Sequence, residues 1–120
     1  DFGRAVAPFF ETHDALLSAT MAEPPAEVGR FAHDRFDDFR EYRLGRRGVL
    51  PYSPFCPVYN ATGQPAVSLP LWWSGEGLPI GVQIAAGFGE DPLLMALSAE
   101  IERARPWFDR RPPAARRFNG

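Results

Sequence analysis

Hydrophobic and polar residues alternate along the chain with periods that predict short helices and short strands. Residues 4–12 carry Val6, Phe9 and Phe10 at helical spacing, which indicates the end of a helix. Residues 14–20 contain a short apolar run between an aspartate and a pair of prolines, which indicates a buried strand. The prolines direct the chain into an extended or turn path after this strand.

Residues 30–46 combine many charged side chains with regularly spaced aromatic residues. Phe36, Phe39 and Tyr42 are three positions apart, which predicts one charged helix with an aromatic stripe. We interpret this stripe as core packing rather than as a ligand-binding surface, because amphipathic helices usually bury their apolar face.

The segment 52–63 has signals for the start and the end of a helix. Ser53 is a residue type that caps helix starts, and Pro54 suits the first helical turn. Gly63 suits the position just past a helix end. These signals predict a short helix over 54–62.

Two strands are predicted next, at 66–72 and 79–86, because apolar side chains alternate with other residues in both. The Ser-Gly-Glu-Gly sequence at 74–77 fits a hairpin connection between them. One face of this hairpin is expected to be buried against the helix that follows it. The side chains of that face are Val67, Leu69, Ile80 and Val82.

A longer helix is predicted after the hairpin. Asp91 is expected to cap its start with Pro92 in the first helical position, and Pro106 stops it. The face expected to pack on the hairpin consists of Leu93, Leu97, Ile101 and Ala104. The Arg- and Pro-rich residues 108–120 are predicted to form a flexible tail.

Composition narrows the class of protein. The chain has 120 residues, of which 45% are hydrophobic and 23% charged, as in globular proteins. The net charge of −2 argues against nucleic acid as a partner. No apolar stretch approaches the roughly 20 residues that span a bilayer, and no export signal is expected. Cys56 is the single cysteine, which excludes an intrachain disulfide and favours a cytoplasmic protein.

Several kinds of catalytic site are missing. All 13 basic residues are arginine, so the chain has no phosphate-loop lysine and no lysine base. His13 and His33 have no further cysteine or histidine at metal-ligand spacing, so no metal site is predicted. Nothing places either histidine beside a serine. The glycines of 75–89 match no dinucleotide fingerprint, so no cofactor is predicted.

Two motifs resemble a known family. The sequence FCPVYNATGQPAVSLP at 55–70 and GLPIGVQI at 77–84 resemble the carboxy-terminal block of amidase signature enzymes. The upstream DALLSATMAEPP at 14–25 is similar to a strand of that family that runs into a proline-rich loop. The pair Trp72-Trp73 resembles the subgroup that contains bacterial 6-aminohexanoate cyclic-dimer hydrolases.

The resemblance implies an α/β fold, with a mixed, twisted sheet and helices on both faces. Residues 1–107 are then the carboxy-terminal segment of an amidase domain, incomplete as a domain. Such enzymes hydrolyse amides with a serine nucleophile, a second serine in a cis peptide and a lysine base. None of these residues is expected in this chain, so the chain alone is expected to be inactive.

The resemblance also places part of a substrate pocket. The short helix before the Thr-Gly-Gln-Pro turn lies beside the acyl-binding cavity in family members, which maps onto Ser53, Phe55 and Cys56, with Tyr52 nearby. A capped helix start would add partial positive charge beside aromatic surface. The alternative, given equal weight, is that these residues only cap and pack a helix.

The expected partner is a small-molecule amide substrate, with a homodimer left open and no nucleic acid or membrane partner. Two alternative functions remain open at this stage. One is the A subunit of a tRNA-dependent amidotransferase, which shares the same block. The other is a non-catalytic interaction module or relic of the fold.

Overall fold

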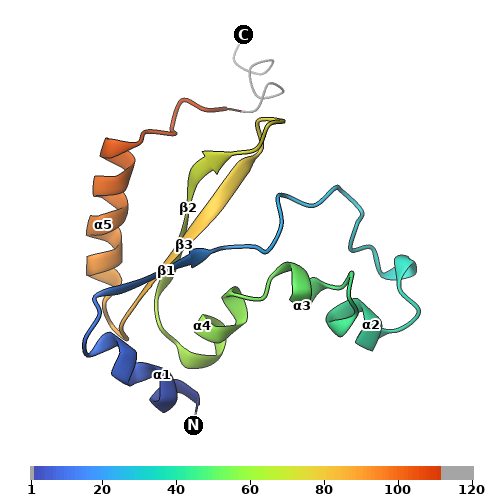
Figure 1. The fold of residues 1–120 in the computed structure, drawn as a ribbon, viewed down its shortest axis with the longest axis horizontal. Coiled ribbons are helices and arrows are strands. Elements are labelled where there is room, and N and C mark those ends of the chain that lie inside the picture. The colour runs from blue at the N-terminus through green and yellow to red at the C-terminus, as the bar shows by residue number, and fades with distance from the viewer. Residues whose placement is uncertain (1, 112–120) are drawn as a thin grey trace.

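The structure, a computed structural model, describes residues 2–111 and contains one antiparallel sheet of three strands (Figure 1). The strands are β1 (Ala15–Ala19), β2 (Ala66–Trp73) and β3 (Pro79–Ala86), in the order β1-β3-β2. All three strands that the sequence predicted are therefore confirmed. The predicted flexible tail falls mostly on 112–120, which lie outside the described residues.

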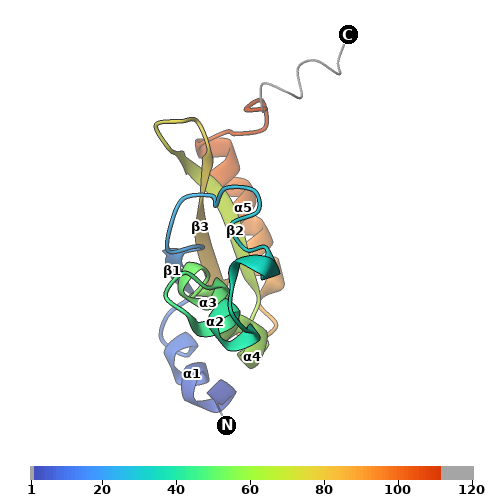
Figure 2. The same ribbon diagram turned by 90° about the vertical axis from the view of Figure 1, so that its right-hand side faces the viewer.

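Helices lie on both faces of this sheet. The long helix α5 (Asp91–Ala104) covers one face, and Figures 1 and 2 place the short helices of the chain's middle part on the other. These and the remaining helices are α1 (Phe2–Phe10), the 3-10 turn His33–Arg35, α2 (Phe39–Leu44), α3 (Val49–Tyr52) and α4 (Cys56–Thr62). The α/β class with helices on both faces is confirmed. Within the described part of the chain, no helix has the length and apolar character to cross a membrane.

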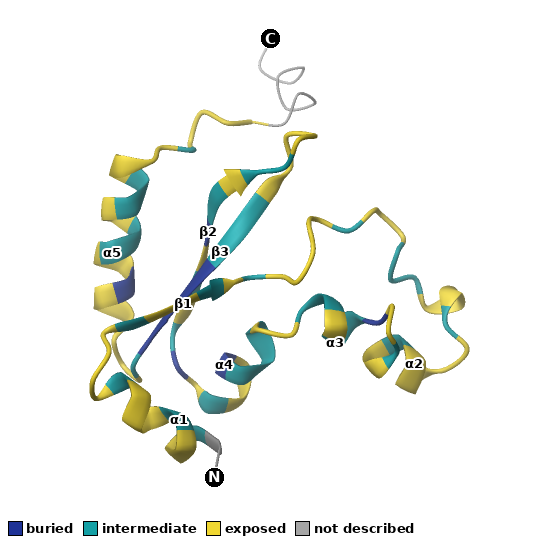
Figure 3. Ribbon diagram, in the orientation of Figure 1, coloured by how far each residue is buried: buried dark blue, intermediate teal, exposed yellow. Residues whose placement is uncertain are grey.

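The core lies between the hairpin and α5. Its buried residues are Leu69, Ile84, Ala86 and Leu94. Figure 3 shows buried stretches on β3 and on α5 in dark blue. Partly buried residues pack around them, namely Ala15, Val67, Leu71, Leu97, Ile101 and Trp107. The predicted packing of hairpin against helix is thus confirmed in outline.

The centre of this core differs from the prediction. Ile80 and Val82 stay outside the buried cluster, and Ile84 takes the central place. The reason is the short turn after β3, which places Leu94 in the first turns of α5 near the end of that strand. The packing face of α5 is Leu94, Leu97 and Ile101, so the prediction of Leu93 and Ala104 is wrong. The cap position is Glu90, not Asp91.

A β-bulge interrupts the alternation in β2. Pro70 pairs with Gly81 but Trp72 pairs with Ile80, so Leu71 has no partner in the ladder. Proline has no N–H to donate to a sheet, which favours a bulge beside it. Beyond the bulge, Trp72 is 61% exposed while Trp73 is half-buried.

The prediction that 14–20 forms a buried strand is wrong in its burial. Leu16 and Leu17 in β1 are 37% and 67% exposed. Within the described residues β1 pairs only with β3, at the edge of the sheet, and α5 packs on β2 and β3 instead.

The prediction of one helix over 30–46 is also wrong. Phe36 has an extended backbone (φ −129°, ψ 141°), which separates the 3-10 turn from α2. A new helix start follows, because Asp38 accepts a hydrogen bond from the Glu41 N–H at 2.7 Å and Glu41 accepts one from the Asp37 N–H at 2.9 Å. Phe39 is 71% exposed, so the aromatic stripe is not a core face.

The predicted helix over 54–62 begins later than expected. Helix α4 starts at Cys56 with Phe55 in the cap position and Pro57 in its first turn, whereas Ser53 ends α3. Val49–Tyr52 closes its own turn, in which the Ser53 N–H donates to the Val49 carbonyl at 2.9 Å. Ser53 is therefore not a helix cap for α4, and the argument from a capped helix start fails. Gly63 ends α4 with φ 78°, as predicted.

Candidate functional site

A row of polar side chains crosses the sheet on the face turned away from α5. Ser18 pairs with Gln83, and Gln83 pairs with Ser68, so the three residues share one face of adjacent strands. Gln83 is only 4% exposed. A buried amide needs partners for both of its ends, and here they come from β1 and from α4.

Cys56, at the start of α4, supplies one of these partners. Its thiol donates to Gln83 Oε1 at 3.3 Å and reaches the carbonyl oxygen of Thr20 at 3.5 Å. Gln83 in turn directs its Nε2 at Ser18 Oγ, 3.5 Å away. Cys56 thus joins α4 to the sheet, which fits a pocket or packing role better than that of a nucleophile.

Gly81 leaves space for a second polar contact on this face. Thr20 Oγ1 and Ser68 Oγ lie 2.6 Å apart across β3. A Cβ atom on Gly81 would lie 2.7 Å from the first oxygen and 2.6 Å from the second. Only glycine allows the two outer strands to join their hydroxyl groups over the central strand.

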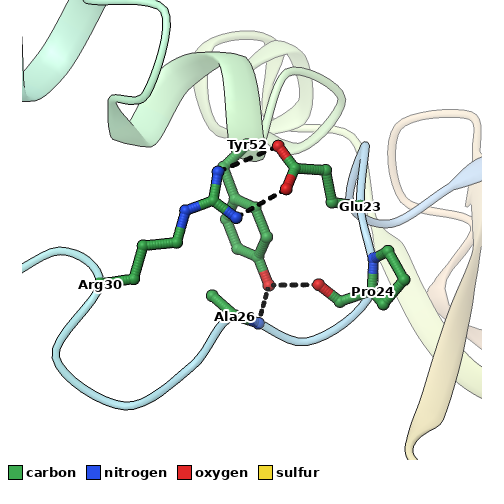
Figure 4. A network of polar contacts seen from close by, with 5 residues as sticks. All are labelled: Glu23, Pro24, Ala26, Arg30 and Tyr52. Atoms are coloured by element: carbon green, nitrogen blue, oxygen red, sulfur yellow. Dashed lines mark hydrogen bonds and ion pairs between the residues drawn. The ribbon is translucent and has the colours of Figure 1, made fainter.

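Tyr52 connects α3 to the proline-rich loop that follows β1 (Figure 4). Its hydroxyl accepts a hydrogen bond from the Ala26 N–H at 3.0 Å and donates one to the Pro24 carbonyl at 3.4 Å. Its own carbonyl accepts from the Ala22 N–H at 3.0 Å. Three contacts from one residue therefore hold the loop against α3.

An ion pair completes this network. Arg30 donates two hydrogen bonds to the carboxylate of Glu23, at 2.6 and 3.0 Å, and its guanidinium lies 5.2 Å from the centroid of the Tyr52 ring. These hydrogen bonds lower the pKa of Glu23 and raise that of Arg30. Figure 4 shows the Arg30 guanidinium against the Tyr52 ring, with the Glu23 carboxylate facing the guanidinium.

The four predicted pocket residues occupy different positions. Cys56 and Tyr52 both contact the segment that follows β1, through Thr20 and through Ala22 to Ala26. Ser53 is half-buried between α3 and α4, and Phe55 is 37% exposed. A hollow of about 120 Å³ lies beside Tyr52 and reaches Met21 and Gly81. The structure brings Tyr52 and Cys56 to one side of the sheet, and their substrate role stays a prediction.

The polar row itself was not predicted from the sequence. A signal was present, because Ser18, Ser68 and Gln83 each interrupt an otherwise apolar strand. That signal gains meaning only when the strand register places the three residues opposite one another.

No alternative catalytic centre emerges from the described residues. His13 stacks on Phe9 with ring centroids 4.3 Å apart, and His33 contacts Tyr42 at 4.5 Å. Neither ring has a serine among its described contacts. Residues 2–111 contain no cluster of three or more His, Cys, Asp or Glu side chains that could hold a metal ion.

Comparison with known proteins identifies the family. The amidase family model matches residues 2–95. Amidase AmiC of Mycobacterium tuberculosis is 40% identical over 99 residues, covering 82% of this chain and 20% of that protein. The 6-aminohexanoate-cyclic-dimer hydrolase of Paenarthrobacter ureafaciens is 38% identical over 104 residues, with the same two coverages of 82% and 20%.

A solved structure agrees with these sequence matches. The structure of a 6-aminohexanoate cyclic dimer hydrolase superposes with a TM-score of 0.79 at 32% identity, covering 92% of this chain and 23% of that one. The chain belongs to the amidase family, and the predicted resemblance is confirmed. It spans about a fifth of the length of the curated relatives that it matches.

Proposed function

We propose that the protein carrying this chain hydrolyses a carboxylic amide bond. The observation that carries the proposal is the agreement of sequence and fold with amidase relatives, including the 6-aminohexanoate cyclic dimer hydrolase, along most of the chain. That hydrolase acts on an amide, and both identity and structural likeness extend through the hairpin and the segment before it. The proposed reaction uses no metal and no organic cofactor.

The catalytic groups are proposed to lie in a part of the protein outside these residues. Amide hydrolysis by an activated serine needs a base within hydrogen-bonding distance of the nucleophile. This chain contains no lysine, and its two histidines contact a threonine and aromatic rings rather than a serine. The proposed serine nucleophile, second serine and lysine base therefore belong to the remainder of the enzyme.

The contribution of this chain is proposed to be one wall of the substrate pocket. The Cys56–Gln83–Ser18 contacts fix the start of α4 on the sheet. This anchoring holds the exposed ring of Phe55 and the neighbouring Ser53 in place, and Tyr52 holds the adjoining loop. Such a surface, with two aromatic and two small polar side chains, suits a small and largely apolar amide.

The reaction can be tested on the protein at its native length. Release of amine from a panel of small apolar amides is measured, and a serine-reactive fluorophosphonate is used to label the nucleophile. We expect hydrolysis and a label that maps outside these 120 residues. A label on a serine of this chain would contradict the proposal that the nucleophile lies outside these residues.

Two other outcomes would favour the alternative functions. Glutaminase activity that requires partner subunits would favour the amidotransferase subunit, and absence of any hydrolysis would favour an interaction module.

The wall can be tested by one substitution and a matched control. Phe55→Ala is expected to raise KM several-fold with a smaller change in kcat, because it removes apolar contact with bound substrate in ground state and transition state alike. Phe88→Ala, in the exposed turn before α5, is the control and should leave both constants unchanged. Equal changes of KM and kcat in the two variants would show that Phe55 does not line the substrate pocket.

A cytoplasmic location is also proposed. It is supported by Cys56, a free thiol that a reducing compartment would preserve.

A further inference from the structure

Figure 1 shows that the segment following α5 runs past the tip of the β2–β3 hairpin. A cleft of about 390 Å³ lies between residues of the hairpin and of that segment. Its apolar lining residues are Pro70, Trp73, Leu78, Pro79 and Trp107. None of Tyr52, Ser53, Phe55 and Cys56 lines it, although Pro79 also borders the hollow beside Tyr52. The volume is that of a site for a small ligand, and two indole rings offer a large, rigid apolar surface.

Two guanidinium groups lie at this cleft. The Arg110 guanidinium stands 4.0 Å from the centroid of the Trp73 ring, and the backbone N–H of Arg110 donates to the Trp107 carbonyl at 2.9 Å. Arg111 also lines the cleft. Neither guanidinium forms an ion pair with a carboxylate of the described residues, and Glu76 is the one acidic side chain among the lining residues. The cleft therefore carries an excess of positive charge.

We propose that this cleft binds a small amphipathic carboxylate, with an aromatic or aliphatic body and one carboxylate group. The body packs on the indoles of Trp73 and Trp107, and the carboxylate receives hydrogen bonds from Arg110 and Arg111. A guanidinium presents its N–H groups in a planar fork that matches a carboxylate. Stacking on Trp73 holds the Arg110 fork at the cleft without using its N–H groups. The proposal concerns a site separate from amide hydrolysis and does not depend on it.

Two probes with the same body separate the contributions. 4-Phenylbutyrate and 4-phenyl-1-butanol share an aromatic ring and a four-carbon chain but differ in the charged head group. Binding to the native-length protein is measured by titration calorimetry and by tryptophan fluorescence. We expect the acid to bind about tenfold more tightly than the alcohol, as charge-assisted hydrogen bonds predict.

Variants test where the probes bind. The double substitution Arg110→Gln and Arg111→Gln is expected to abolish the preference for the acid, whereas Leu78→Ala weakens both probes. Arg105→Gln is the matched control, since its guanidinium lies over Trp72, 5.7 Å from the ring centroid, and does not line the cleft. Amide hydrolysis by the Arg110/Arg111 variant should be unchanged, which separates a failure here from a failure of the proposed enzymatic function.

Four results would overturn the proposal. They are equal affinity for the two probes, no binding of either, a preference that survives the double substitution, and binding that occurs only after removal of 112–120. The last result would assign the cleft to the chain's own terminal segment.

Discussion

The hairpin with α5 and the segment 20–55, here called the arm, are stabilised in different ways. The hairpin and α5 share a cluster of buried apolar side chains, with Ile84 and Leu94 only 3% and 5% exposed. The arm has short helices and no buried apolar side chain. Hydrogen bonds, one ion pair and contacts between partly buried aromatic rings hold it together. Apolar burial is non-directional and tolerates imprecise placement, whereas the arm depends on particular donors and acceptors.

This difference predicts a graded response to substitution. The largest loss is expected in the hairpin core, where Ile84→Ala removes a branched side chain from the centre of the cluster. The free energy of unfolding should fall by about 3 kcal/mol, as for other buried large-to-small changes. Urea or thermal unfolding measures it, and Leu17→Ala in the exposed part of β1 is the control. Similar losses for both would show that Leu17 is covered in the full protein and would weaken the contrast.

Gly48 is expected to be a sensitive position of the arm. A Cβ atom there would lie 2.5 Å from the Tyr42 carbonyl oxygen and 2.8 Å from that of Glu41, and backbone oxygens cannot rotate away. Gly48→Ala should cost about 2 kcal/mol of unfolding free energy or displace α2 from α3. Gly75→Ala, with nothing within 4 Å of the added atom, should change little. A tolerated Gly48→Ala would mean that the arm adjusts freely.

Tyr52→Phe tests the hydrogen bonds of the arm without changing its shape. The partly buried Ala26 N–H loses its acceptor, which should cost about 1 kcal/mol. Hydrogen exchange should speed up at Ala26 and leave β3 unaffected. Tyr42→Phe is the control, because the Tyr42 hydroxyl has no hydrogen-bond partner among the described residues. Equal exchange rates in the two variants would show that the Tyr52 hydroxyl does not hold the loop.

The smallest effect is expected for the exposed ion pair. Because Arg30 lowers the pKa of Glu23 below its usual 4.5, the pair contributes stability above that value and loses it as pH falls through the lowered pKa. Limited proteolysis of the arm should therefore accelerate in acid, and Glu23→Gln should show the fast rate at neutral pH. Glu100→Gln, from a pair 3.9 Å apart on α5, should leave the rate unchanged. If the proteolysis rate of the unmodified protein does not change with pH, the ion pair does not stabilise the arm.

The same contrast explains which predictions succeeded. The hairpin and α5 were predicted with nearly correct bounds, because alternation and helical spacing report directly on which side chains are buried. Within the arm, residues 30–46 were predicted wrongly as one helix, although their aromatic spacing fits a helix. Asp38 and Glu41 begin a new helix through two local hydrogen bonds, and spacing of apolar residues carries no information about them.

The candidate site was likewise predicted only in part. Tyr52 and Cys56 were selected from the motif, but their partners were not. The Cys56 thiol bonds to Gln83, and Gln83 bonds to Ser18. The register of β1 and β3 brings Gln83 and Ser18 together although they lie 65 positions apart in the chain. The helix-start argument for Ser53 failed because α3 ends at that residue.

The sequence by itself determined the family, the three strands, the long helix and the absence of a lysine base. These follow from local periodicity, from two motifs and from composition, all of which can be read along one chain. Only the tertiary structure decided that β1 lies at an edge, that a thiol and an amide join α4 to the sheet, and that two tryptophans and two arginines line one cleft. Each of these depends on strand order, register and loop path. Those are fixed by contacts between distant residues, and local pattern does not encode them.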